Sequence, residues 1–213
     1  MKKHKYHNVA ATHLREYSSI YLFVIVLFLM GVIFGAVIVN SLSFEQKEDL
    51  FYYLSEFFGQ ASAGKVAETK DLFLQSFMHN SKFIGLIWLL GISIIGLPII
   101  LVMLFLKGMV VGFTVGFLVN QMGWHGFLLS FVSILPQNLV IIPVYIVTAA
   151  LSTIFSLKMI KNQFMKKLNQ PVLPMFMRYM GVFLLAVVFL AAAAGIEASF
   201  PPALLKVVIP AIK

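Results

Sequence analysis

Six acidic side chains in the segment 41–82 are of a type that could carry out acid–base chemistry. Paired carboxylates can act as general acid and general base when their surroundings separate their pKa values. The six lie within short amphipathic patterns, where a solvated helix face accounts for their charge. They are Glu45, Glu48, Asp49, Glu56, Glu68 and Asp71. We therefore predict no acid–base site from them.

Motifs for metal, phosphate or nucleophilic chemistry are also missing. The chain has no cysteine, no H-E-x-x-H and no G-x-S-x-G. The stretch GQASAGK at 59–65 does not match a phosphate-binding loop, because Val66 stands where a Ser or Thr would hold magnesium. His125 follows Trp124 in GWHG, where a turn at the membrane interface is a simpler explanation than a metal ligand. We predict a protein that is not an enzyme and holds no metal or cofactor.

Two adjacent amides, Gln137 and Asn138, interrupt a long apolar run in the stretch SILPQNLVIIP (133–143). Polar groups inside a membrane usually face the bundle interior and pair there, and a proline frees a carbonyl of the preceding turn. A kink held by hydrogen bonds between helices is one interpretation, and a substrate path is the other. The residues predicted to kink a span or to place polar groups in it are Pro98, Pro136, Gln137, Asn138 and Pro143.

The composition places the elements that carry these residues in a membrane. The chain is 61% hydrophobic and 11% charged, with a mean hydropathy of +0.96, whereas soluble domains carry about 25% charged residues. A membrane span needs about 20 apolar residues. The long apolar runs are Ile20–Val39, Phe83–Leu106, Met109–Val119, Phe127–Leu157 and Tyr179–Ile196. We predict an all-α polytopic membrane protein with about five transmembrane helices, the third of them unusually short.

The positions of the charged residues predict the orientation. With the N-terminus in the cytoplasm, ten of the sixteen Lys and Arg residues, Lys107 among them, fall on the inner side, and seven of the eight acids fall outside. The inner loop 158–178 has five basic residues and no acid, as the positive-inside rule requires. The net charge of +8 therefore reflects topology and contact with membrane lipids, and we predict no binding to nucleic acid. No acid lies inside a predicted span, and Glu197 lies only at the edge of the last, which argues against an ion-coupled transporter.

These spans divide the chain into seven segments, of which the third is the only sizeable one outside the membrane. The C-terminus is predicted to lie outside the cytoplasm. The segments are a basic cytoplasmic segment (1–18), a first transmembrane helix (19–40), an extracytoplasmic amphipathic loop (41–82), a three-span bundle (83–157), a basic cytoplasmic loop (158–178), a fifth transmembrane helix (179–197) and an extracytoplasmic tail (198–213).

The loop 41–82 is predicted to form an amphipathic helical hairpin with its turn at 59–65. Ser43 and Gln46 have the spacing of a capping box, and an apolar stripe at helical spacing follows them. Such helices could lie flat on the outer leaflet or dock the apolar surface of a partner. The candidate partner-binding residues are Leu50, Phe51, Leu54, Phe57, Phe58, Trp124 and His125.

Gly108, Gly112 and Gly116 follow one another at intervals of four residues, and Gly31 and Gly35 repeat the spacing in the first span. Glycines at this spacing let helix backbones approach closely, and van der Waals packing is what drives helix association in lipid. We expect these glycines to lie where helices pack together. Packing among the spans of one chain and a seam between copies in a homo-oligomer are both compatible with the spacing.

Three motifs occur in a recognisable order. A basic N-terminal segment precedes FVIVLFLMGVIFG (23–35), and KGMVVGFTVGF (107–117) and ILPQNLVIIPVY (134–145) follow the amphipathic loop. This order resembles the stage II sporulation protein M family over essentially the whole chain. More distant relatives often have an acid near the proline of the last motif, where this chain has Gln137 and Asn138, so no role of an acid is transferred there.

The resemblance implies a multi-pass membrane protein of the sporulating cell. Such a protein would assemble with two septal peptidoglycan-degrading proteins, one of amidase/endopeptidase type and one of lytic transglycosylase type. It would anchor and localise them at the septum and the engulfing membrane, where the septal wall is thinned and the forespore is engulfed. The residues alone indicate neither sporulation nor peptidoglycan. They leave a permease-like or channel subunit as the alternative, with the broken span and the glycine face as its path.

Overall fold

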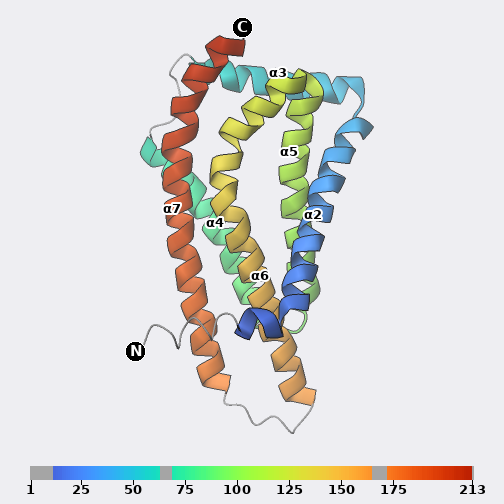
Figure 1. Cartoon of the computed structure of the whole chain (residues 1–213), viewed down its shortest axis with the longest axis vertical. Helices are drawn as coiled ribbons and strands as arrows, with labels where there is room; N and C mark the ends of the chain where they lie inside the picture. Colours follow the sequence, from blue (N-terminus) through green and yellow to red (C-terminus); the bar gives the residue numbers. More distant parts are fainter. Residues whose placement is uncertain (1–11, 63–68, 165–171, 213) are drawn as a thin grey trace.

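The protein is a bundle of long helices with one helix across its end. A computed structural model describes residues 12–62, 69–164 and 172–212, and these contain helices and short turns but no strand. The helices are α2 (Ser18–Ser41), α3 (Phe44–Ser62), α4 (Thr69–Gly91), α5 (Gly96–Ser133), α6 (Leu135–Phe164) and α7 (Val172–Ile212). Figure 1 shows α2, α4, α5, α6 and α7 running along the length of the molecule, with α3 lying across the upper end.

Four segments of the described helices are long and apolar enough to cross a membrane. They are Ser18–Ser41, Gly96–Ser133, Pro136–Lys161 and Phe176–Ala198. The chain is therefore an all-helical polytopic membrane protein. α4 runs beside these helices (Figure 1) but carries charged residues and is not among the four. The orientation of the chain and the number of its crossings stay predictions from the sequence.

The run Phe83–Leu106, predicted as one span, is divided between two helices. α4 ends at Gly91 and α5 begins at Gly96, with a tight turn between them. A Cβ at Gly96 would overlap the Leu90 carbonyl oxygen, so the turn needs glycine here. Pro98 consequently lies in the first turn of α5, where its missing N–H has no helical partner to lose, and it does not kink a span.

The third predicted span is not short, because the helix that contains the run Met109–Val119 already begins at Gly96. The helix breaks at Gly123, whose φ of 55° and ψ of −128° are accessible to glycine and strained for other residues. After this residue the chain turns back, and residues 124–133 lead into α6 (Figure 1). The apolar part of α5 is thus long enough to span a membrane.

The prolines of the next motif lie at and after a break in the helical path. The run Phe127–Leu157 is interrupted at Ile134, and α6 begins at Leu135. Ile134 itself has helical φ and ψ, its N–H donates to the Ser130 carbonyl at 2.8 Å, and its carbonyl accepts from the Asn138 N–H at 3.3 Å. The helical path therefore continues through this residue, and Pro136 lies two residues after the break, where a proline kink is expected. Pro143 does lie inside α6.

The loop 41–82 is not a hairpin lying flat at one end. α3 covers its first half, but its second half already belongs to α4, which descends along the bundle (Figure 1). The reason is that Phe77 packs against the core and that Ser76 and Asn80 are buried. In the predicted tail 198–213, α7 continues without a break to Ile212.

The five glycines of the two small-residue motifs lie at one seam between α2 and α5. A Cβ at Gly112 would overlap the Val32 carbonyl oxygen, and one at Gly35 would overlap the Met109 carbonyl oxygen. Gly31 and Gly108 face backbone in the same way, and a Cβ at Gly116 would lie 2.9 Å from the Ala36 Cα. Since α2 occupies this face of α5, the glycines are not available to a second copy of the chain.

The seam generates a stability prediction for Gly112→Ala. The new methyl group meets backbone and not a flexible side chain, so we expect a loss of about 1–3 kcal/mol in the free energy of unfolding. The matched control is Gly181→Ala on α7, where a Cβ meets nothing within 4 Å. Thermal unfolding of the purified protein in detergent measures both, and an equal Tm for the two variants would contradict the close approach of α2 and α5.

Candidate functional site

A carboxylate with hydrogen-bond donors from two other helices lies inside the bundle. Glu197 of α7 accepts a hydrogen bond from the hydroxyl of Ser76 on α4. With the Gln137 amide oriented so that its nitrogen faces the carboxylate, this nitrogen donates to both Glu197 oxygens, at 2.8 and 2.9 Å. Gln137 thus forms the hydrogen bond between helices that the sequence suggested, and its partner is Glu197.

The same group of polar residues continues to α5 and α6. The hydroxyl of Tyr145, which is fully buried, donates to the side-chain oxygen of Asn80, and Asn80 donates to the Ser76 carbonyl at 3.0 Å. The Lys107 ammonium lies 5.1 Å from the centre of the Tyr145 ring and 5.5 Å from that of Phe83. We call Ser76, Asn80, Lys107, Gln137, Tyr145 and Glu197 the polar cluster.

Of the two charged members of the polar cluster, Lys107 lies deeper than the sequence suggested. Lys107, predicted at the inner surface, is eleven residues after Gly96 and sixteen before Gly123, about 16 and 24 Å along α5. Glu197 lies at the end of the apolar segment Phe176–Ala198, as predicted, and α7 continues beyond it to Ile212. Charges inside a bundle are tolerated when they are paired and hydrogen-bonded, and Glu197 is close enough to Lys107 for the two charges to attract.

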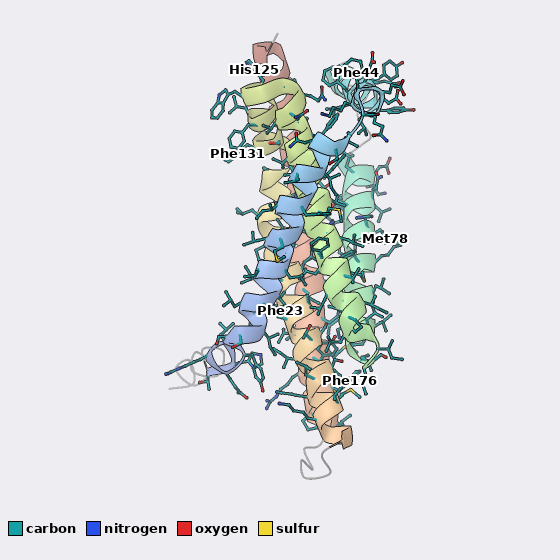
Figure 2. All side chains as sticks on the ribbon, turned by 90° about the vertical axis from the view of Figure 1, so that its right-hand side faces the viewer. Phe23, Phe44, Met78, His125, Phe131 and Phe176 are labelled. Carbon is teal, nitrogen blue, oxygen red and sulfur yellow. The ribbon has the colours of Figure 1, made fainter. Side chains whose placement is uncertain are left out.

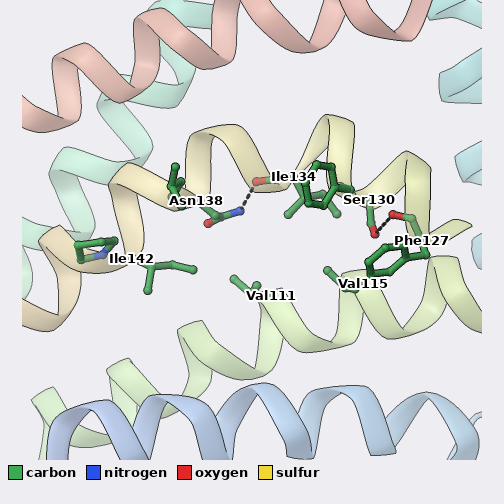
Figure 3. Close-up of a pocket in the computed structure, with 10 residues that line it drawn as sticks. Val111, Val115, Phe127, Ser130, Ile134, Asn138 and Ile142 are labelled. Atoms are coloured by element: carbon green, nitrogen blue, oxygen red, sulfur yellow. Dashed lines mark hydrogen bonds between the residues drawn. The ribbon is translucent and has the colours of Figure 1, made fainter. Parts of the chain in front are cut away.

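A recess of ≈ 440 Å³ lies between α5 and the start of α6 (Figure 3). Its polar side chains turn to their own helix, because Asn138 donates to the Ile134 carbonyl at 2.9 Å and Ser130 donates to the Phe127 carbonyl at 2.8 Å. The rest of its wall is aliphatic or aromatic, with Val111 and Val115 on the side of α5. Asn138 therefore donates within its helix, and the wall of this recess is mainly apolar.

α3 presents aromatic side chains at one end of the molecule. Its start is fixed by the predicted capping box, in which the Ser43 N–H donates to the Gln46 side-chain oxygen at 3.0 Å and the Gln46 N–H donates to the Ser43 hydroxyl at 3.3 Å. Phe44, Tyr52 and Tyr53 are 80%, 64% and 68% exposed. These three were not among the residues predicted to bind a partner, and they are the most exposed of the aromatic side chains described on this helix.

The five candidate partner-binding residues on α3 that were chosen from the sequence divide into three groups. Leu50 and Phe51 are partly exposed, at 37% and 40%. Leu54 instead packs against Leu118 and Leu129 and attaches α3 to the two parts of α5 on either side of the break at Gly123. The side chains of Phe57 and Phe58 lie outside the described residues.

Trp124 and His125 lie at the same end, after the break at Gly123. Trp124 is 69% exposed and stacks on Phe127, with 5.3 Å between the ring centres. His125 is also exposed. Figure 2 shows His125 and Phe44 at opposite edges of this end, so the two candidate regions form separate surfaces.

The hydrogen bond between Gln137 and Glu197 predicts coupled stability. Glu197→Leu removes the acceptor of Ser76 and Gln137, and Gln137→Leu removes one donor of the partly buried Glu197, so we expect each to lower the free energy of unfolding by about 1–3 kcal/mol. The double variant should lose less than the sum, by about 0.5–3 kcal/mol, because the two residues share one interaction. A double-mutant cycle in detergent measures the coupling.

The matched control for this cycle is the exposed pair Asn40 and Asn120, joined by a hydrogen bond of 3.3 Å. Their leucine variants should combine almost additively, because water can replace the lost partner. Additive losses for Gln137 and Glu197 as well would show that the two side chains do not interact.

Comparison with known protein families adds an independent finding. Residues 24–202 match the family model of stage II sporulation protein M. No curated protein and no solved structure matches the chain. The matched range begins in α2 and ends in α7, so it contains α3 and every member of the polar cluster. The chain belongs to the stage II sporulation protein M family.

Proposed function

We propose that this protein is a non-enzymatic membrane scaffold that anchors and localises peptidoglycan hydrolases at the sporulation septum and the engulfing membrane. Its partners would be a protein of amidase/endopeptidase type and one of lytic transglycosylase type. Membership in a sporulation membrane protein family supports the cellular setting of this proposal. The surface that would bind the partners is on α3.

The observation that carries the proposal is the exposure of Phe44, Tyr52 and Tyr53 on a helix whose position is fixed. Aromatic side chains on a rigid element contribute strongly to binding, because little conformational freedom is lost when they are covered. The capping box fixes one end of α3, and Leu54 fixes its underside. The exposed aromatic residues are thus held ready for a partner at one end of the bundle.

Membrane lipid is the other surface that could cover these aromatic rings. Tyrosine and phenylalanine at a membrane interface can lie at the level of the headgroups, as in the aromatic belts of membrane proteins. In that case a charged substitution on α3 would leave the binding of proteins unchanged. The two proposals therefore differ in a measurable way.

The experiment is a pull-down of the tagged protein from solubilised membranes of sporulating cells. We expect both classes of hydrolase to co-purify with the unchanged protein, and Phe44→Glu/Tyr53→Glu to reduce their recovery at least tenfold, since buried aromatic residues at interfaces contribute about 2 kcal/mol or more each. The control Glu48→Ala changes an exposed residue of the same helix and should leave recovery unchanged.

Two results would contradict the proposal. Undiminished recovery of hydrolases with the double variant would place the binding surface elsewhere and leave α3 to the lipid. Co-purification of an ATPase without any hydrolase would favour the permease-like alternative. Leu54→Glu is unsuitable for this test, because Leu54 packs within the protein and its change would displace α3.

A further inference from the structure

The outward face of α4 is polar along part of its length and is covered by no described residue. Four polar side chains at helical spacing are exposed on it, namely Asp71, Gln75, His79 and Lys82. Apolar side chains lie among and below them, with Leu74 53%, Met78 46% and Leu86 48% exposed. We call this set of residues the α4 face.

The lower part of the α4 face lies at the depth of the apolar spans. Asn80 bonds to Tyr145, which is nine residues below Pro136 in the apolar segment Pro136–Lys161. Further down α4, the Trp88 carbonyl accepts a hydrogen bond of 2.8 Å from Tyr179, which lies in the segment Phe176–Ala198. Lys82 lies between these two levels and points outward.

Lipid cannot satisfy the charge of Lys82 at this position. A lysine near the end of a spanning helix can extend its ammonium group to the interface. Lys82 is six residues below Ser76, which bonds Glu197 at the end of the segment Phe176–Ala198, and nine residues above Gly91. These separations are about 9 and 14 Å along the helix, which is further than its side chain reaches. Among the described residues no acid forms an ion pair with it. The contrast is Lys107, which lies against two aromatic rings and near Glu197.

A second copy of this chain does not fit the α4 face. Copies in one membrane share their orientation, so a twofold axis along the membrane normal would place the two α4 helices parallel. Lys82 would then face Lys82 and Asp71 would face Asp71, and like charges at these positions repel. The charges of this face require complementary groups, which only a different sequence supplies.

We infer that the α4 face binds a transmembrane helix of another protein, and that this helix carries an Asp or Glu at the level of Lys82. The partner's remaining contacts are with Leu74, Met78 and Leu86. Gly85 lies next to Lys82 along the helix, and a Cβ there would meet nothing within 4 Å, so it leaves room for the partner backbone to approach. This binding site would be one of the contacts by which the scaffold holds its partners. It rests on the proposed function only in requiring that the partners are anchored in the membrane.

The test uses the absence of cysteine from the chain. A single Met78→Cys variant is labelled with a benzophenone maleimide in membranes of sporulating cells and irradiated. The control is Val188→Cys on α7, which is 65% exposed within an apolar span. We expect a protein adduct from position 78 and not from 188, and mass spectrometry should place the cross-link in an apolar segment that contains an Asp or Glu.

Charge variants then test the role of Lys82. Lys82→Glu should lower the yield of the adduct at least tenfold, Lys82→Arg should keep it, and changing the partner's acid to Lys should restore it in the Lys82→Glu background. Tm values of the purified variants show whether each remains folded, and Lys82→Gln replaces Lys82→Glu where it does not. Adducts with a second copy, adducts with lipid alone, equal yields from both positions or no charge dependence would each overturn the proposal.

The results for α3 and α4 are separable. If hydrolases depend on Phe44 and Tyr53 but position 78 yields only lipid adducts, the site on α4 is wrong and the scaffold function stands. If position 78 yields an acidic transmembrane helix of a protein that is no hydrolase, the site stands and the scaffold function as proposed is wrong.

Discussion

The carboxylate of Glu197 imposes the strictest condition on this bundle, because a partly buried charge between packed helices is destabilising when it loses its hydrogen-bond donors. Its donors come from Ser76 on α4 and Gln137 on α6. These two contacts set the rotation of α4, α6 and α7 about their axes. Lys107 orients α5 relative to the same helices, because its ammonium lies against one ring from α4 and one from α6. Helices in lipid have little hydrophobic drive to associate, so such specific contacts decide how they pack.

The glycine seam completes the arrangement by a different physical means. α2 contributes nothing to the polar cluster and is held to α5 by close backbone contact at Gly35 and Gly112. Because α3 follows α2 after two residues, the position of α2 largely determines where α3 begins. Leu54 then fixes α3 against Leu118 and Leu129. The exposure of aromatic residues at this end thus depends on the packing of the spans beneath it.

Local patterns predicted the parts of the structure that depend on neighbouring residues. The capping box at Ser43 and the clustering of the glycines follow from spacing alone. Pro98 shows the limit, because it lies in the first turn of α5, and a proline in an apolar run fits a helix start as well as a kink. The polar cluster could not be predicted, since Ser76 and Glu197 are 121 residues apart and no pattern relates them. Because membrane spans were expected to be apolar, Ser76 was predicted in the loop outside the membrane and Glu197 at the edge of the last span.

Lys82 and Lys107 both lie at the depth of the apolar segments, where a positive charge needs a compensating group. Lys107 is compensated within the chain, by aromatic rings and by the nearby Glu197. Lys82 lies on the outer side of α4 without such compensation, and α4 follows α3 along the chain. A partner with one transmembrane helix and a domain outside the membrane could therefore contact α4 with the helix and α3 with the segment that leaves it. Binding at both places would raise the effective concentration at each, so moderate affinities at α3 and α4 would suffice to hold the partner in place.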